Sequence, residues 1–178
     1  ERDEPKTAEE LLRRFIRNPR SHVWVAKAYE KLGDAFVDLE KHKTAIDAYT
    51  QAISRSSNPN DQTHAGFKLG NAYMEIGNES RAVDAFDQAI RTGEKNDIYV
   101  RVPDSYYKIA DYVYGQQRYD KALDYYRLVT RKYPGFQETP WGLFQMGSIY
   151  KNKKEYEKAI KIYKHLIREH PDDYWARQ

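Results

Sequence analysis

The sequence predicts an all-α protein built from repeated pairs of helices, and three observations carry that prediction. Apolar residues recur at three- and four-residue spacing, which is typical of amphipathic helices. Prolines follow two of the helical segments, at Pro134 and Pro171, where a helix has to end. A short pattern also returns along the chain: LGDAF at 32–36, LGNAY at 69–73, IADYV at 109–113 and MGSIY at 146–150.

Three positions of this pattern keep their register in all four copies. A small residue is followed by alanine twelve residues later, and an aromatic residue stands four residues after that alanine. The small residues are Gly33, Gly70, Ala110 and Gly147; the alanines are Ala45, Ala82, Ala122 and Ala159; the aromatic residues are Tyr49, Phe86, Tyr126 and Tyr163. The small residues are 37, 40 and 37 residues apart. This regularity predicts one structural unit repeated four times.

Each copy reads as two helices joined by a polar or glycine-containing turn. A glycine inside a helix costs about 1 kcal/mol relative to alanine, so its recurrence needs a reason. We expect the small residue of the first helix and the alanine of the second to lie where the two helices cross. Aromatic residues such as Phe36 and Tyr49 would then fill the space on either side.

These positions resemble the tetratricopeptide repeat (TPR) family, including the aromatic residue three positions after the small one and the closing proline. The resemblance implies a right-handed α-solenoid and one TPR domain over 1–178. We assign a leading helix at 8–20, repeats at 26–59, 63–96, 103–136 and 140–173, and the start of a further helix at 174–178. Trp175 would then lack a packing partner. Because the sequence begins at Glu1 without methionine, we expect it to be a fragment of a longer array.

Two details are similar to repeat proteins of the bacterial envelope, such as the Tol-Pal-associated periplasmic protein and the lipoprotein of the barrel-assembly machinery. The spacings exceed the family's usual period of about 34 residues, and two copies end in YP or HP. The resemblance implies a periplasmic location, with the cytoplasm as the alternative. The chain has no cysteine, which excludes disulfides and thiolate chemistry and fits both compartments.

Composition and motifs argue against several other classes of function. The net charge of +3 is too small to indicate nucleic-acid binding, and acidic residues interrupt the lysines between 151 and 164, as on a solvated helix face. There is no apolar run of about 18 residues that would span a membrane. The histidines lack metal-site spacing, and no glycine-rich phosphate loop is present. We therefore predict no catalytic residues, no metal and no cofactor.

The remaining positions of the first helices are the informative ones. In stacked repeats of this type the first helices line a concave groove. Apolar and aromatic residues stand at the groove positions where polar residues would be expected, with carboxylates among them. We predict that the partner-binding residues are Phe67, Asn71, Met74, Asp104, Tyr107, Asp111, Tyr114, Trp141 and Phe144.

An apolar and aromatic lining on a protein surface is typical of a binding site. The sequence therefore predicts a non-catalytic scaffold whose aromatic and acidic groove binds a protein or peptide segment. The carboxylates favour a segment that is apolar and carries Lys or Arg. The alternative is a structural array that self-associates within a larger envelope assembly.

Overall fold

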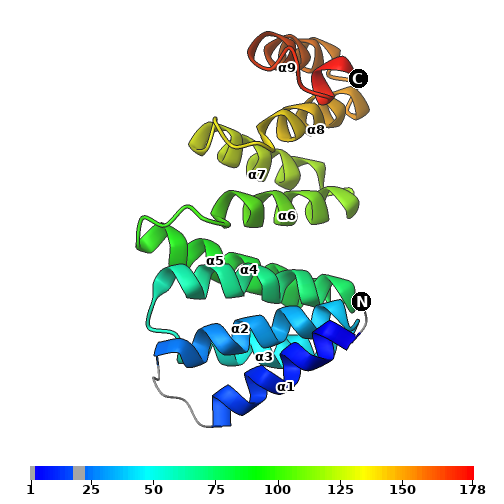
Figure 1. Ribbon diagram of the computed structural model, residues 1–178. Coiled ribbons are helices and arrows are strands. Elements are labelled where there is room, and N and C mark those ends of the chain that lie inside the picture. Colours follow the sequence, from blue (N-terminus) through cyan, green and yellow to red (C-terminus); the bar gives the residue numbers. More distant parts are fainter. Residues whose placement is uncertain (1–2, 18–22) are drawn as a thin grey trace. The chain divides into compact units, whose positions relative to one another are not determined.

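The computed structural model describes the fold of residues 3–17 and 23–178, and these residues form nine α-helices and one short 3₁₀ helix (Figure 1). The helices are α1 (Asp3–Arg17), α2 (Val23–Asp38), α3 (His42–Arg55), α4 (Pro59–Glu75), α5 (Glu79–Lys95), α6 (Val102–Gly115), α7 (Tyr119–Lys132), α8 (Thr139–Asn152), α9 (Tyr156–Glu169) and η1 (Trp175–Arg177). The all-α prediction is confirmed.

The four predicted copies appear as the helix pairs α2–α3, α4–α5, α6–α7 and α8–α9 (Figure 1). The leading helix α1 begins at Asp3, earlier than the predicted range of 8–20. Its early start is compatible with Pro5, since proline is tolerated in the first turn of a helix. The end of the predicted range, residues 18–20, lies outside the described residues.

The chain divides into two compact units, Glu1–Ser105 and Tyr106–Gln178, and the boundary falls within α6. We call them unit 1 and unit 2. In the sequence, the boundary lies within the longest interval between small residues, the 40 residues from Gly70 to Ala110. Unit 1 holds the first two helix pairs behind α1, and unit 2 holds the last two pairs and η1.

The turn inside each pair has the same backbone geometry in every copy. The residue seven positions after the small residue is left-handed, with φ of 57° at Glu40, 71° at Gly77, 60° at Gln117 and 62° at Lys154. The amide of the following residue donates to the carbonyl five positions back, as Lys41 does to Phe36 at 2.8 Å. This is the Schellman arrangement that closes a helix C-terminus. Only one of the four copies uses glycine there, so three copies hold a strained residue at this position.

The recurring glycine lies against an aromatic ring. A Cβ added to Gly33, Gly70 or Gly147 would stand 2.4, 2.4 and 2.3 Å from the rings of Tyr49, Phe86 and Tyr163. The expectation that a larger side chain would not fit at this position is therefore confirmed, and the atoms nearest to the glycine belong to the ring. The ring sixteen residues later lies directly against the glycine, and the alanine is also buried, with Ala45 and Ala82 fully enclosed.

A hydrogen bond accompanies that packing wherever the ring is a tyrosine. The residue directly after the small residue receives the hydroxyl: Tyr49 donates to Asp34 at 2.9 Å, and Tyr126 donates to Asp111. The Tyr163 hydroxyl lies 3.2 Å from the Ser148 hydroxyl in the fourth copy. The second copy has Phe86 instead, so no hydroxyl reaches its Asn71.

Candidate functional site

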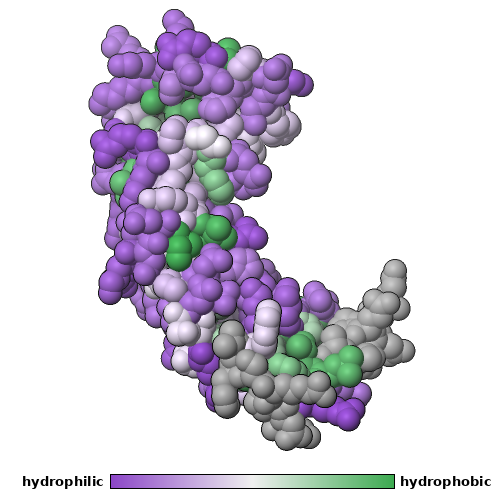
Figure 2. All heavy atoms as spheres, turned by 60° about the vertical axis from the view of Figure 1, so that its left-hand side comes forward, coloured by the Kyte–Doolittle hydropathy of each residue, from purple (hydrophilic) through white to green (hydrophobic). Residues whose placement is uncertain are grey.

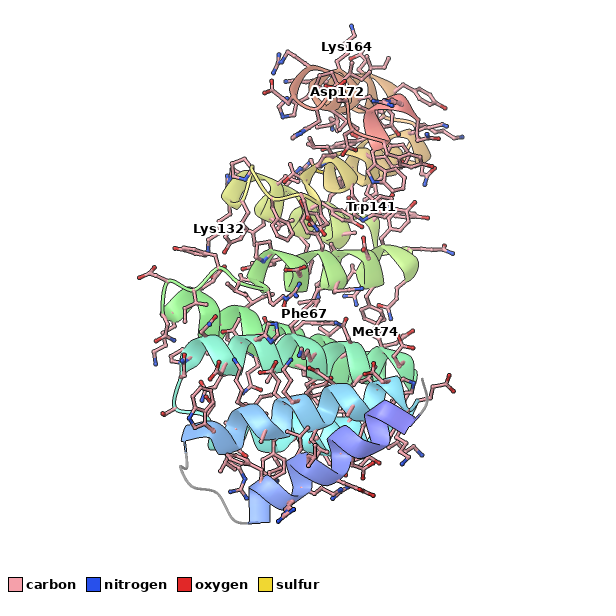
Figure 3. All side chains as sticks on the ribbon, in the orientation of Figure 1. Phe67, Met74, Lys132, Trp141, Lys164 and Asp172 are labelled. Carbon is pink, nitrogen blue, oxygen red and sulfur yellow. The ribbon has the colours of Figure 1, made fainter. Side chains whose placement is uncertain are left out.

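The predicted groove residues lie on the first helices of the pairs, and the two units present them separately. Unit 1 presents α2, α4 and the start of α6, whereas unit 2 presents the rest of α6 and α8. Figure 3 labels Phe67 and Met74 on α4 and Trp141 on α8. We call these two surfaces the unit 1 face and the unit 2 face. On the side shown in Figure 2 the surface is mostly hydrophilic, with apolar atoms gathered in small separate patches.

Three rings on the unit 2 face form what we call the aromatic cluster: Trp141, Phe144 and Trp175. The Trp141 and Trp175 centroids are 4.4 Å apart, and Phe144 lies 5.0 Å from Trp175. Trp141 and Phe144 are nearly parallel, with centroids 6.2 Å apart. Trp175 therefore has partners, contrary to the prediction that it would lack one. It packs there because η1 folds back onto α8 and α9.

The cluster borders a pocket of about 570 Å³ between α8, α9 and η1. Its lining combines rings with polar groups: Tyr114, Phe144, Ser148, Lys151, Asn152, Tyr163, Leu166, Ile167, Trp175, Ala176 and Gln178. Of the predicted site residues, Tyr114 and Phe144 line this pocket, and Trp141 stands behind them in the cluster. Tyr114 also packs on Tyr119 at 5.6 Å. The structure thus brings three of the predicted residues together around one hollow.

Tyr107 does not lie on the surface. Its side chain is only 4% exposed, and it stacks on Phe136 with centroids 6.1 Å apart. Gly142 explains the burial, because its missing side chain lets the α8 backbone approach the tyrosine: an added Cβ would be 2.7 Å from the ring. Tyr107 is therefore a core residue in this structure, and its assignment to the groove surface is corrected.

The carboxylates among the predicted residues are already engaged inside the protein. Asp111 accepts hydrogen bonds from the Tyr126 hydroxyl and, at 3.0 Å, from Nε1 of Trp141. Burial raises the pKa of Asp111, although both hydrogen bonds act in the opposite direction. Asp104 forms an ion pair with Arg101 at 3.4 Å. Both carboxylates already interact with neighbouring side chains. They are therefore less available to pair with a cation of a partner than the sequence predicted.

The three predicted residues of α4 lie on the unit 1 face and remain partly exposed. Phe67 packs on Phe86 with centroids 5.8 Å apart, and the Arg101 guanidinium lies 5.3 Å from the Phe67 ring. Asn71 and Met74 follow at one-turn spacing along the same side of α4. Because Phe86 carries no hydroxyl, its ring makes no hydrogen bond to the Asn71 amide, unlike the tyrosines of the other copies.

A charge network on the unit 1 face was missed by sequence reasoning. Glu30 is 3% exposed, and its carboxylate lies 2.9 Å from Nδ1 of His64 and 2.8 Å from Nζ of Lys68. Lys68 also donates to Asp34 at 2.7 Å. Burial alone would raise the pKa of Glu30, but the hydrogen bonds from His64 and Lys68 outweigh it and lower the pKa to about 2. The signal in the sequence was the interval of 34 residues that separates Glu30 from His64 and Asp34 from Lys68, about one repeat.

Among the described residues no group of three or more His, Asp or Glu side chains is placed to hold a metal ion. In the part of the chain that the structure describes, no helix is long and apolar enough to cross a membrane. What the two faces do present is partly exposed rings beside hydrogen-bonding side chains, an arrangement that can hold the side chains of another polypeptide.

The repeated helix pairs of this chain, each with a small residue packed against an aromatic ring, place it in the class of helical repeat proteins. Within this class, sequence models of the tetratricopeptide repeat match residues 30–97, 67–135 and 142–173. The chain therefore belongs to the tetratricopeptide repeat family, and the predicted α-solenoid fold is confirmed. No curated protein sequence matches the chain at a significant level.

Solved structures of TPR proteins are similar to this chain. The YrrB protein, described as a TPR protein with an unusual peptide-binding site, is 20% identical with a TM-score of 0.67; the match covers 98% of this chain and 82% of that one. PilF of Pseudomonas aeruginosa is 19% identical with a TM-score of 0.68, covering 98% and 72%. A Rap protein complexed with Competence and Sporulation Factor is 17% identical with a TM-score of 0.66, covering 94% and 47%. At these identities the likeness establishes the fold alone.

Proposed function

We propose that the protein is a non-catalytic scaffold that binds an extended or helical segment of a protein partner on its first helices. The observation that carries the proposal is the aromatic cluster of Trp141, Phe144 and Trp175 at the edge of the 570 Å³ pocket. Large rings at a pocket edge are typical anchors of protein interfaces. Membership of the TPR family supports this, as do neighbours whose descriptions name a peptide-binding site or a bound signalling factor.

The proposed contact residues are the predicted ones that remain accessible. They are Phe67, Asn71, Met74 and Asp104 on the unit 1 face, and Asp111, Tyr114, Trp141 and Phe144 on the unit 2 face. Tyr107 is left out because it is buried. On the unit 2 face the exposed charge at the pocket is Lys151 rather than a carboxylate. The segment proposed for unit 2 therefore has a bulky apolar residue next to a carbonyl or carboxylate group, whereas a basic segment remains the proposal for unit 1.

The test starts from binders selected on the protein itself from a random peptide library. Phe144→Ala should weaken the binders that occupy the unit 2 pocket by about 30-fold, which corresponds to the 2 kcal/mol typical of an interface anchor. Tyr156→Ala is the matched control, since Tyr156 is an exposed aromatic residue outside the pocket. Circular dichroism should show both variants folded. Binders that tolerate Phe144→Ala and a matching Phe67→Ala on the unit 1 face would refute the proposal.

A second candidate function, self-association, is favoured by an apolar stripe on α9. Ile160 and Ile167 are 52% and 54% exposed. The residue of the third copy that corresponds to Ile160, Leu123, is only 3% exposed. In this alternative another copy of the chain, as part of an envelope assembly, covers the stripe. Sedimentation should then show an oligomer that Ile160→Asp dissociates and Phe144→Ala leaves intact; a monomer at high concentration would exclude it.

The bacterial envelope is the compartment we propose, on the basis of the long repeat spacing and the YP and HP endings. Fractionation of the source cells with an antibody to the protein tests this directly. Recovery with cytoplasmic rather than periplasmic or membrane markers would refute it.

A further inference from the structure

A second hollow in unit 2 lies on the side of the second helices, away from the aromatic cluster. It has a volume of about 820 Å³ and runs between α7 and α9 over α8. Its apolar lining consists of Leu128, Leu143, Met146 and Ile162, with Pro134 at one end. No residue of this hollow lines the 570 Å³ pocket. We call it the α7–α9 cleft.

The same place in unit 1 is nearly closed. There the hollow between α3 and α5 measures about 60 Å³. Five of its six lining residues stand 77 positions before a residue of the α7–α9 cleft: Ile53, Gln62, Gly66, Gln88 and Thr92 correspond to Thr130, Thr139, Leu143, His165 and Glu169. The two hollows are therefore equivalent positions of the repeat, and only the one in unit 2 is open.

One difference between the repeats lies at the helix crossing beneath the hollow. Gly66 lets α4 and α5 approach closely, because a Cβ added to it would lie 3.2 Å from Cβ of Ala89. Leu143 occupies the equivalent position on α8. A leucine at that crossing prevents the same approach and leaves space beside it, with its own side chain as part of the floor. The open cleft thus follows in part from Leu143, which replaces the glycine of the second copy in the fourth copy.

Acidic and basic side chains share the rim of the cleft. Asp124 lies 3.8 Å from Arg127, and Glu169 lies 2.7 Å from Arg168, so both acidic groups have basic neighbours. Arg131 stands at the end near Pro134 and His170. Within residues 23–178, no hydrogen bond or ion pair engages its guanidinium. Arg131 is therefore a cationic group at this end that has no partner within the described part of the chain, whereas Glu169 at the same end is paired with Arg168.

We propose that the α7–α9 cleft binds an amphipathic helix of a protein partner, with aliphatic side chains on the apolar floor and an Asp or Glu paired with Arg131. Helices commonly bind by laying an apolar face into such a groove, and Met146 gives the floor a shape-adaptable side chain. Small-molecule sites usually have converging buried polar groups. Among the described residues, none of the buried polar atoms without a hydrogen-bond partner belongs to a residue lining the cleft.

The probe is a synthetic amphipathic peptide with leucines at i, i+3, i+4 and i+7 and glutamates on the opposite face, labelled for fluorescence anisotropy. A second peptide with lysines in place of the glutamates reports the charge preference. Ile162→Glu should weaken binding of the glutamate peptide by about 30-fold, as expected for loss of an interface anchor. Arg131→Glu should weaken it by about three- to tenfold at low salt and less at high salt, and should improve binding of the lysine peptide.

Lys161→Glu is the charge-matched control, because Lys161 is exposed on α9 and does not line the cleft. Phe144→Ala separates this cleft from the aromatic cluster and should leave the peptide's affinity unchanged. Equal binding of the two peptides, or binding insensitive to Ile162→Glu, would overturn the proposal. So would the absence of peptide binding, including a result in which only a small apolar anion such as decanoate binds in an Ile162-dependent way.

Discussion

Gly70→Leu tests the packing on which the whole repeat depends. The glycine lies on α4 directly under the ring of Phe86, and a Cβ added to it would stand 2.4 Å from Cε1 of that ring. Ordinary contact begins near 3.4 Å, so the ring has to move by about 1 Å even for a methyl group. Phe86 is only 1% exposed, which leaves it no open space to move into.

Two opposing terms set the magnitude. Replacing glycine inside a helix gains up to about 1 kcal/mol of helix propensity. Overpacking a filled core costs about 1–3 kcal/mol, and a leucine, with three carbons beyond Cβ, belongs at the upper end of that range. We therefore expect Gly70→Leu to lower the stability of unit 1 by about 2 kcal/mol. In a segment of this size that corresponds to a fall of about 10 °C in Tm.

The assay is thermal unfolding followed by circular dichroism, with Gly70→Ala as an intermediate step. The third copy provides a comparison, because Ala110 occupies the position equivalent to Gly70. Ala110 and the equivalent ring of Tyr126 are both fully buried. Combining Gly70→Ala with Phe86→Leu should recover part of the loss, since residues in contact are not additive. An unchanged or raised Tm for Gly70→Leu would show that propensity outweighs packing and that the glycine is not needed at this crossing.

Three further predictions concern the left-handed turn inside a helix pair, the charge network around Glu30, and the hydrogen bond from the tyrosine hydroxyl to the residue after the small residue. Gly77→Ala should cost about 1 kcal/mol in a denaturant titration because φ is 71°. The added methyl group contacts no other atom, so the cost comes from the backbone alone. Gly115→Ala, at an equally open helical position, should be neutral or stabilising. Glu30 has a folded pKa of about 2 against 4.5, so the unfolded state binds the proton more tightly. Its stabilisation is complete above pH 4.5 and is lost as the pH falls toward 2; Glu30→Gln should flatten this part of the stability–pH curve, and an unchanged slope would contradict the network. Tyr126→Phe should cost about 1–2 kcal/mol because it removes a donor from the partly buried Asp111 carboxylate; a melting curve identical to wild type would show that this hydrogen bond is not stabilising.

The fold could be predicted because its signal is repeated four times. The positions equivalent to Gly33, Ala45 and Tyr49 are buried in every copy except at Tyr163, which is partly exposed and lines the pocket. Contacts inside a copy depend on residues at fixed separations, so their spacing is visible in the sequence. What the spacing did not reveal was the pairing itself, in which the glycine receives the ring.

The candidate site was harder to predict because exposure depends on the neighbouring repeat. Tyr107 occupies one of the predicted groove positions, yet Gly142, 35 residues later, lets the α8 backbone approach its ring. Trp175 looked unpaired until η1 placed it against Trp141. Lys68 was predicted to be neither a core nor a groove residue, although its charge is complementary to two carboxylates of the previous copy. Such contacts between copies depend on helix orientation, which single-copy periodicity does not contain.

The closely packed, mutually tilted indoles of Trp141 and Trp175 also have a spectroscopic consequence. At a centroid separation of 4.4 Å the electronic transitions of the two rings couple, which produces a paired positive and negative band in the circular dichroism spectrum. The third tryptophan, Trp24, is in unit 1 and 60% exposed, so its emission belongs to a solvated indole. Unit 2 can thus be followed by excitonic dichroism and unit 1 by red-shifted fluorescence. The protein carries two optical probes that distinguish its halves without any added label.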